Sequence, residues 1–428
     1  MTKKLTQFDQ ADLAQLEQSL SHDFELVSGN KLSLDLSRGK PAADQLSLSE
    51  GMEGVIAGNY FAADGTDVRN YGHIRGLVEA RELGAELLGV PAECIIAGGN
   101  SSLHLMHLVV STAMQAGLWN DARHWSASAP VKILTPVPGY DRHYTLTEAL
   151  GAQMVNIDMT EQGPDLEQAL ALVRQDSSVK GIWCVPKYSN PTGCTYSDET
   201  VAALAALPNE AAADDFVVLW DNAYAVHDLV EPPRQLASIY EAAQQKGTLD
   251  HVVQFASASK ITFAGGGVAF ISSSETVLQA LEDQLSYMLI GPDKVNQLRH
   301  SRFLSGRLAE HMQAHARLLR PKFALVEETL SKELGELDIA SWTKPEGGYF
   351  VSLDLRPGLA KTVIEMASSI GLTLTPAGAP FPYGRDPQDR NVRIAPTFAS
   401  VEDLRAAMQI LALCVKLATV RQLIKTQS

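Results

Sequence analysis

The sequence predicts an α/β protein with a large, mostly parallel sheet followed by a smaller α+β unit. Through the middle of the chain, short apolar segments alternate with helical segments, which is the pattern of strands joined by crossover helices. The apolar segments are continuous, as expected for parallel strands that helices cover on both faces. After about residue 305 this alternation gives way to a long helical region and then to mixed strands and helices.

The predicted elements follow in chain order. An amphipathic helix opens the chain, because Leu13, Leu16 and Leu20 recur at helical spacing, and a second helix is predicted over 78–88. The strands predicted for the large sheet are VKILTP (131–136), AQMVNI (152–157), GIWCVP (181–186), FVVLWD (216–221), HVVQFA (251–256) and GGVAFI (266–271). Helices over 166–174 and 199–206 separate several of these strands.

The last third of the chain has a different composition of elements. A long helical region is predicted over 305–333, followed by strands at 350–355 and 392–397 and helices at 360–370 and 401–418. No internal repeat and no Pro/Ser-rich linker divides the chain. The predicted organisation is therefore a large domain at 51–305, with residues 1–50 and 306–428 together forming a small domain.

Composition and charge restrict the class of protein. The 428 residues are 45% hydrophobic and 20% charged, which is typical of a globular chain. Lys plus Arg number 35 against 50 Asp plus Glu, so the net charge of −15 disfavours nucleic acid and anionic membranes as partners. Four cysteines fit no disulfide or zinc pattern, and neither a signal peptide nor an apolar run of ~18 residues is recognised. We expect a cytoplasmic protein.

The histidines do not predict a metal site. His311 and His315 are four residues apart, a spacing that can chelate a metal on a helix, but no Glu follows His311 and no third ligand is evident. A solvated helix face is the expected setting for this pair. His104, His107 and His143 are expected to be packed or capping residues, although each could line a site.

Gly99, Asn100 and Ser101 form a turn that enters a helix after the apolar pair Ile95-Ile96. Exposed amides and hydroxyls at the start of a helix suit a phosphate group. The alternative is an ordinary helix cap provided by Asn100 or Ser101.

Polar residues follow three of the predicted strands, at the sheet edge where α/β proteins bind ligands. Asn190 lies in an Asn-Pro-Thr-Gly turn, and Asp221 ends an apolar strand, where it acts either as a buried carboxylate that needs a partner or as a helix cap. Lys260 follows Ser257 in a Ser- and Gly-rich loop, where a lysine can form a Schiff base or simply be exposed.

The order of these motifs, with Arg393 in NVRIAPT, resembles that of fold-type I pyridoxal-phosphate enzymes, specifically class I aminotransferases of the aspartate aminotransferase kind. The resemblance extends from about Ser37 to Phe398. Stretches such as IGPDKVNQLRH and SKITFAGGGVAF look like the type Ic branch, which is grouped with MocR-type aminotransferase domains.

The resemblance implies a role for each of the catalytic candidates. Lys260 would bind pyridoxal 5′-phosphate as a Schiff base and then act as general base, and Asp221 would pair with the protonated pyridine nitrogen. Tyr224 and Asn190 would hydrogen-bond the phenolic oxygen of the ring. Tyr140 would stack on the ring face.

The resemblance also implies how the phosphate and the substrate are held. Arg393 would grip the α-carboxylate of the substrate as a bidentate fork, and the backbone of Gly39 would contact the same carboxylate. The phosphate-binding residues would be Gly99, Asn100, Ser101, Ser257 and, donated across the interface of a homodimer, Tyr71. No metal is implied.

One position departs from the family pattern. The arginine that usually follows the lysine by eight residues, where it neutralises the phosphate, is Val268 in this chain. Lys187 or a group of a neighbouring subunit could substitute for it. For a dicarboxylic substrate, the cations that could meet the distal carboxylate are Arg38, Lys294, Arg299 and Arg302.

The resemblance implies transamination between an L-amino acid, with aspartate as the expected one, and a 2-oxo acid, with 2-oxoglutarate as the expected one. Two alternatives share the fold. One is a pyridoxal-phosphate lyase or decarboxylase, which breaks another bond of the same substrate. The other is a non-catalytic, cofactor-binding effector domain of a transcription regulator, although no basic DNA-binding segment precedes Gly39.

Overall fold

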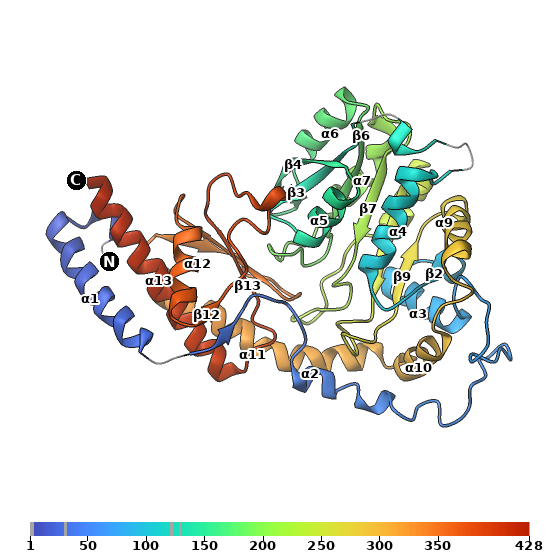
Figure 1. Ribbon diagram of the computed structural model, residues 1–428, viewed down its shortest axis with the longest axis horizontal. Helices are drawn as coiled ribbons and strands as arrows, with labels where there is room; N and C mark the ends of the chain where they lie inside the picture. The colour runs from blue at the N-terminus through green and yellow to red at the C-terminus, as the bar shows by residue number, and fades with distance from the viewer. Residues whose placement is uncertain (1–3, 30–31, 120–122, 128–129, 428) are drawn as a thin grey trace.

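The computed structural model describes residues 4–29, 32–119, 123–127 and 130–427, and it confirms the α/β class (Figure 1). The largest sheet has eight strands in the order β2-β9-β8-β7-β6-β3-β4-β5. Its strands are β2 (Ile95–Ala97), β3 (Lys132–Val137), β4 (Gln153–Thr160), β5 (Gly163–Pro164), β6 (Val179–Cys184), β7 (Val217–Asp221), β8 (Val252–Ser257) and β9 (Ala269–Ser272).

Strand direction in this sheet follows from the connections. Strands β4, β3, β6, β7 and β8 are parallel neighbours, as predicted. Strand β9 is antiparallel to β8, because the chain returns from β8 through the loop 258–268 without a crossover helix. The predicted strand 266–271 therefore begins three residues late, at Ala269, and the glycines before it belong to the loop.

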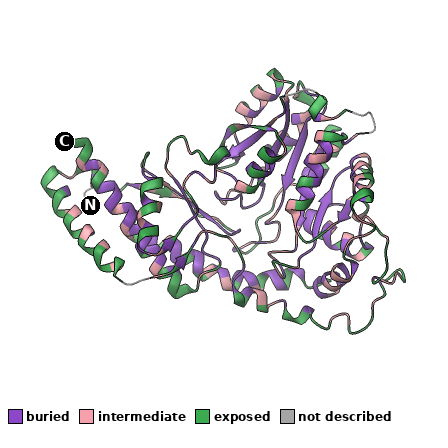
Figure 2. Cartoon of the chain, viewed as in Figure 1, coloured by how far each residue is buried: buried purple, intermediate pink, exposed green. Residues whose placement is uncertain are grey.

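Helices cover both faces of the large sheet, so its central strands are buried on both sides (Figure 2). Successive residues of β7 face opposite cores: Leu219 packs with residues of α4 and α9, and Trp220 packs with residues of α6, α7 and α8. The helices of this part are α3 (Val78–Leu88), α4 (Ser102–Gln115), α5 (Asp141–Ala149), α6 (Leu166–Gln175), α7 (Asp198–Glu210), α8 (Ile239–Lys246), α9 (Glu275–Met288) and α10 (Lys294–Leu304).

The C-terminal part follows a long helix. Strands β10, β11 and β13 form a three-stranded antiparallel sheet. The elements are α11 (Leu308–Leu334), β10 (Ala340–Trp342), β11 (Val351–Leu355), α12 (Ala360–Ser369), β12 (Leu372–Thr373), β13 (Asn391–Ile394) and α13 (Val401–Gln427). Helix α11 packs against both parts, because its first turns contribute Leu308 and Met312 to the core beside the large sheet and its later turns contribute Leu319 to the C-terminal core.

The N-terminal segment packs against the C-terminal one. Helix α1 (Gln10–Ser28) lies beside α13, β1 (Leu34–Asp35) pairs in parallel with β12, and α2 (Ala43–Ser47) contacts α11 (Figure 1). Leu13 and Leu20 of α1 are buried in the same core as α13. The two ends of the chain are thus in contact, and the boundaries at 50/51 and 305/306 stay a prediction.

Helix α13 corrects one expectation about membranes. Its 27 residues are long and apolar enough to span a bilayer, which the sequence reading had excluded for every segment. In the structure, however, 67% of its most apolar window is buried inside the protein, with Leu411, Cys414 and Leu417 fully enclosed. Helix α13 is therefore the central helix of the C-terminal core.

Candidate active site

The predicted site residues gather where β7 and β8 end and α4 begins. Asp221 is the last residue of β7, and Lys260 lies three residues beyond β8 in a turn. Lys260 Nζ lies 4.8 Å from the ring centroid of Tyr224, which is buried. Burial lowers the pKa of Lys260, an effect that the nearby Asp221 carboxylate opposes. The same burial raises the pKa of Tyr224 well above its ordinary value, so its phenol stays protonated.

Asp221 has the partner that a buried carboxylate requires. Its Oδ2 lies 2.9 Å from Nε2 of His143, and both side chains are at most 3% exposed. Its Oδ1 is also buried and has no hydrogen-bond partner among the described residues. The next helix begins only at Ile239, so the alternative reading of Asp221 as a helix cap is wrong.

His143 is the main site residue whose role the sequence did not reveal. Its ring stacks on Trp183 at 4.2 Å with an interplanar angle of 10°, and Tyr140 meets it edge-on at 4.9 Å. Trp183 in turn donates from Nε1 to Thr147. His143 is packed, as expected, but this packing also orients Nε2 toward Asp221. The sequence signal for this role was the position of His143, three residues after Tyr140 in the first turn of α5.

Arg393 joins Asn190 on the substrate side. Its Nη1 donates to Asp141 Oδ1 at 2.9 Å and to Asn190 Oδ1 at 3.3 Å, and its Nε donates to Thr375 Oγ1 at 3.2 Å. The guanidinium lies over the ring of Phe350, 5.0 Å from its centroid. Asp141 and Thr375 were not singled out in the sequence, because their contacts with Arg393 span 252 and 18 residues of chain.

Gly39 lies against the same aromatic ring. A Cβ atom at Gly39 would overlap the ring of Phe350, so only glycine fits without moving that ring. The structure therefore brings Gly39 close to Arg393 through Phe350.

Two of the residues predicted to bind the phosphate, Asn100 and Ser257, lie close together in the structure. Ser259 connects them, because its Oγ donates to the carbonyl of Asn100 at 2.9 Å and lies 2.8 Å from Ser257 Oγ. Asn100 Nδ2 donates to Gly265 O. Ser101 occupies the N-cap of α4 but makes no side-chain capping bond, so the N-terminal amides of α4 stay available to an anion.

The missing arginine has no direct replacement in this cluster. Val268 is buried in the core with Ala258 and Ile261, where a charged side chain would not fit. Lys187, one suggested substitute, is held by Asp228 at 2.9 Å and by the carbonyl of Ala225. Arg299 is connected to the glycines after Lys260. Its Nη2 donates to Asn296 Oδ1, and Asn296 Nδ2 donates to the carbonyls of Gly266 and Gly267.

Tyr71 is the one predicted site residue that stands apart. It is 78% exposed, and none of the described contacts joins it to Lys260 or to the phosphate candidates of its own chain. The neighbouring Gly72 donates from its backbone to Ile290, and Lys294 donates to the carbonyl of Gly72.

His311 and His315 correct a second expectation, because both are buried rather than solvated. Each donates from Nε2 to the carbonyl of Ile261, at 2.7 and 2.9 Å, directly after Lys260. Tyr349 donates to the carbonyl of Lys260 itself at 3.4 Å. Burial lowers the pKa of His315 to about 4, so the ring is neutral at neutral pH. By contrast His104 and His107, expected to be packed, are exposed on α4.

Comparison with known proteins identifies the family of this chain. The family model for aspartate amino-transferase matches residues 8–427. An aspartate aminotransferase of Corynebacterium glutamicum is 41% identical over 417 residues, which is 97% of this chain and 96% of that protein. The chain belongs to the aspartate aminotransferase family.

Solved structures agree with the family at the level of the fold. An aspartate transaminase from Corynebacterium glutamicum superposes with a TM-score of 0.95 over 99% of this chain and all of that one, at 41% identity. An α-aminoadipate aminotransferase of Thermus thermophilus, complexed with N-(5′-phosphopyridoxyl)-L-leucine, shares the fold at 20% identity, with a TM-score of 0.74 over 94% and 95% of the two chains. The chain is thus a fold-type I aminotransferase, and pyridoxal 5′-phosphate is the cofactor of this family.

Proposed function

We propose that this aminotransferase transfers the amino group of aspartate to 2-oxoglutarate, with Lys260, Asp221, Tyr224, Asn190 and Arg393 as its central residues. The observation that carries the assignment of the site is the environment of Asp221. A buried carboxylate bonded on one side to His143 and unpartnered on the other lies close enough to Lys260 to influence its pKa. A cationic ring nitrogen is the group that such an orphaned oxygen would bind.

The residues present fit pyridoxal phosphate at each of its groups. Asp221 Oδ1 offers an acceptor for the ring nitrogen, and Lys260 offers an amine whose pKa is lowered by burial. Gly99, Asn100, Ser101 and Ser257 surround the start of α4, whose amides suit the phosphate. Tyr140 lies beside His143 on the same side as Asp221, which suits a ring-stacking role.

When bound, the cofactor supplies an electron sink that makes the α-proton of an amino acid acidic. The chain supplies the rest. Lys260 Nζ would hold the cofactor, and its amine would move the proton at the substrate α-carbon. His143 would fix the orientation of the Asp221 carboxylate by donating from Nε2 to its Oδ2. Tyr224 and Asn190 are positioned to donate to the phenolic oxygen of the ring.

The α-carboxylate of the substrate would bind Arg393. The side chain of Arg393 is 7% exposed, and its guanidinium is paired with Asp141. The substrate carboxylate would therefore replace Asp141 or share the guanidinium with it. Asn190 contacts this guanidinium directly, and Gly39 lies against Phe350, whose ring the guanidinium covers. This arrangement supports the substrate-binding assignment of all three residues.

The choice of a dicarboxylic substrate rests on cations that have no carboxylate partner. Lys294 donates to Gly72 O, Arg299 to Asn296 Oδ1, and Arg302 to the carbonyls of Asn59 and Phe61. None of the ion pairs among the described residues involves these three cations, so they remain able to attract a distal carboxylate. The name of the Corynebacterium glutamicum relative points to the same substrate.

A homodimer is part of the proposal. Tyr71, Tyr287, Met288 and Ile290 are all more than 60% exposed, and Gly72 bonds to Ile290, so they form one apolar surface, here called the Tyr71 surface. Covering it with a second copy would bring Tyr71 and the cations of α10 to the partner's site. A cytoplasmic location and membership of the MocR-related branch stay predictions.

The test is a half-reaction screen. Holoenzyme is mixed with each amino acid separately, and the cofactor absorbance and the released 2-oxo acid are followed. We expect aspartate and glutamate to react at least about 10-fold faster than alanine or leucine, because a second ionic contact is gained. Release of pyruvate and ammonia instead would indicate a lyase. As a control, Arg393→Lys should slow all amino acids together, since every one carries an α-carboxylate.

A further inference from the structure

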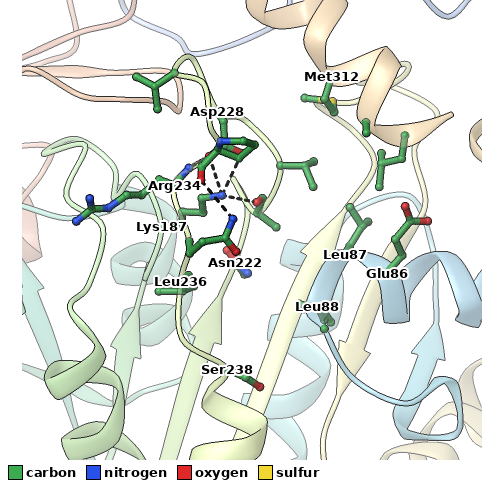
Figure 3. A pocket seen from close by; sticks show the side chains of 18 of the residues that line it. Glu86, Leu87, Leu88, Lys187, Asn222, Asp228, Arg234, Leu236, Ser238 and Met312 are labelled. Carbon is green, nitrogen blue, oxygen red and sulfur yellow. Dashed lines mark hydrogen bonds and ion pairs between the residues drawn. The ribbon is translucent and has the colours of Figure 1, made fainter. Parts of the chain in front are cut away.

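A cavity of about 460 Å³ lies beside the large sheet, bounded by α3, α8, α11 and the segment after β7 (Figure 3). Lys187, Asn222 and Asp228 lie on one side of it, facing Leu87, Leu88 and Met312 on the other. Its volume is within the ~300–1,000 Å³ range of sites for small molecules. Apart from Lys187, which was considered as a substitute for the phosphate arginine, none of the residues predicted for the active site lines it.

The cavity is close to that site but on the other side of β7. Trp220 and Asn222 line it, whereas the residue between them, Asp221, points toward His143. This follows from the alternation of side chains along a strand. Ala225, next to Tyr224, also lines the cavity.

Three polar side chains in the lining make no hydrogen bond among the described residues, and one of their atoms, Asn222 Oδ1, is fully enclosed. Asn222 is 8% exposed, and its Oδ1 is enclosed without a partner. Gln254 of β8 is 3% exposed, and no hydrogen bond joins its carboxamide to any other residue that the structure describes. The same holds for the indole N–H of Trp220, which lies opposite Gln254 in the sheet register. Buried polar groups of folded proteins are normally hydrogen-bonded, so these groups call for a partner.

The buried charges of the lining are paired, whereas Arg234 and Glu86 are exposed to solvent. Lys187 pairs with Asp228 at 2.9 Å, and Arg320 pairs with Glu231 at 2.7 Å. The interior offers amides, an indole N–H and apolar side chains, with Glu86 exposed at the rim. A charged ligand would find no free counter-charge inside, so the lining favours an uncharged one.

We propose that this cavity is a second ligand site, which binds a small, uncharged, planar molecule with an amide or lactam edge. The carboxamides of Asn222 and Gln254 both line the cavity, and carboxamides present donors and acceptors that an amide edge complements in both directions. Leu87, Leu88 and Met312, on the facing side of the cavity, would cover the remaining planar surface (Figure 3). The proposal does not depend on the substrate of the enzyme.

The probe is benzamide, which has an amide edge and an apolar ring. It is titrated into the holoenzyme and followed by ligand-observed NMR, with N,N-dimethylbenzamide, which has no N–H donor, as the comparison ligand. We expect saturable binding of benzamide that saturating aspartate does not displace, and at least about 3-fold weaker binding of the dimethyl compound. A crystal soaked in benzamide should show it against Asn222 and Gln254.

Two variants locate the binding. Gln254→Leu keeps the shape but removes the carboxamide, and should weaken benzamide about 3- to 10-fold. Met312→Trp fills the cavity and should abolish binding. Gln244→Leu, an exposed position on α8 outside the lining, is the matched control and should bind as the wild type does. Thermal unfolding and cofactor absorbance show that each variant is folded.

Several results would overturn the proposal. These are no binding up to the solubility limit of benzamide, displacement by aspartate, or equal binding by Gln254→Leu and Met312→Trp. A soaked crystal that shows only ordered water bridging Asn222 and Gln254 would also contradict it, because water would then be the partner of these amides.

Discussion

At the end of β7, one oxygen of Asp221 accepts from His143 and the other has no partner. The stacking of His143 on Trp183 fixes the imidazole, so the two oxygens of Asp221 are not equivalent. This asymmetry gives the carboxylate a direction, with the unpartnered oxygen left for a ligand. His143 is thus a positioning residue in the proposed mechanism, and Asp221 is the group that would contact the cofactor.

Substituting Asp221 and His143 one at a time should distinguish the cofactor contact of Asp221 from the positioning role of His143. We expect Asp221→Asn to lower kcat/KM by at least about 100-fold, since the ring nitrogen loses its counter-charge. His143→Phe should lower it by about 10- to 100-fold, since one hydrogen bond to a charged group is lost. Both changes should alter the absorption spectrum of the bound cofactor. His107→Phe, an exposed histidine of α4, is the control, and wild-type kinetics and spectrum in His143→Phe would contradict the assignment.

The sequence indicated single candidate residues better than it indicated the contacts between them. Asp221, Lys260 and Arg393 stand at strand ends or in strands with recognisable flanking motifs, so the sequence pointed to them. Their partners did not carry such signals. The contacts of Asp221 with His143 and of Arg393 with Asp141 span 78 and 252 residues, and only the folded sheet brings them together.

At the scale of elements, α11 shows why a helix face can be misjudged. His311 and His315 lie on a face that polar periodicity alone makes look solvated, yet the turn after Lys260 and helix α2 cover it. Gln45 of α2 lies 3.3 Å from His315 Nδ1 and donates to Tyr349, which donates to Lys260 O. Helix α11 therefore holds the carbonyl of Ile261 directly, and α2 supports the carbonyl of Lys260 through Tyr349.

This packing predicts a pH-dependent stability. The pKa of His315 is lowered by burial to about 4 in the folded protein, against ~6.5 when unfolded. The unfolded chain therefore takes up the proton first, so the stabilisation is complete above about pH 6.5 and is lost as the pH falls toward about 4. His315→Gln keeps an N–H donor but cannot titrate.

We expect the wild-type Tm to fall by about 2 °C more than that of His315→Gln between about pH 6.5 and about pH 5. The measurement is a thermal melt at each pH, with the exposed His22→Gln as the control. Parallel curves for wild type and His315→Gln would contradict a buried, neutral His315.

At the scale of the whole molecule, the two ends of the chain meet and the net charge is −15. An acidic enzyme for anionic ligands needs cations that can bind a carboxylate, and α10 carries three cations whose described hydrogen bonds go to neutral oxygens, next to the exposed Tyr71 surface. The alternation of strands and helices was sufficient to predict the main sheet. It could not predict α10 or the apolar surface, because neither has a pattern that distinguishes it from an ordinary soluble helix and loop.

The Tyr71 surface predicts a dimer that is needed for activity. We expect wild-type protein to be dimeric by light scattering. A Met288→Glu/Ile290→Glu variant should be largely monomeric and lose most of its turnover, because a dimer would bury the new charges of both copies without partners. Leu26→Glu is the control, because Leu26 is 60% exposed on α1, outside this surface. A fully active wild-type monomer would contradict the proposal.

The central claim is that Lys260 is the residue that binds the cofactor and carries out the proton transfer. Borohydride reduction of the holoenzyme, followed by peptide mapping with mass spectrometry, tests it directly. We predict a pyridoxyl label on Lys260 alone, unchanged in the surface control Lys246→Ala, and neither label nor turnover in Lys260→Ala. A label on another lysine, or wild-type turnover in Lys260→Ala, would contradict the account.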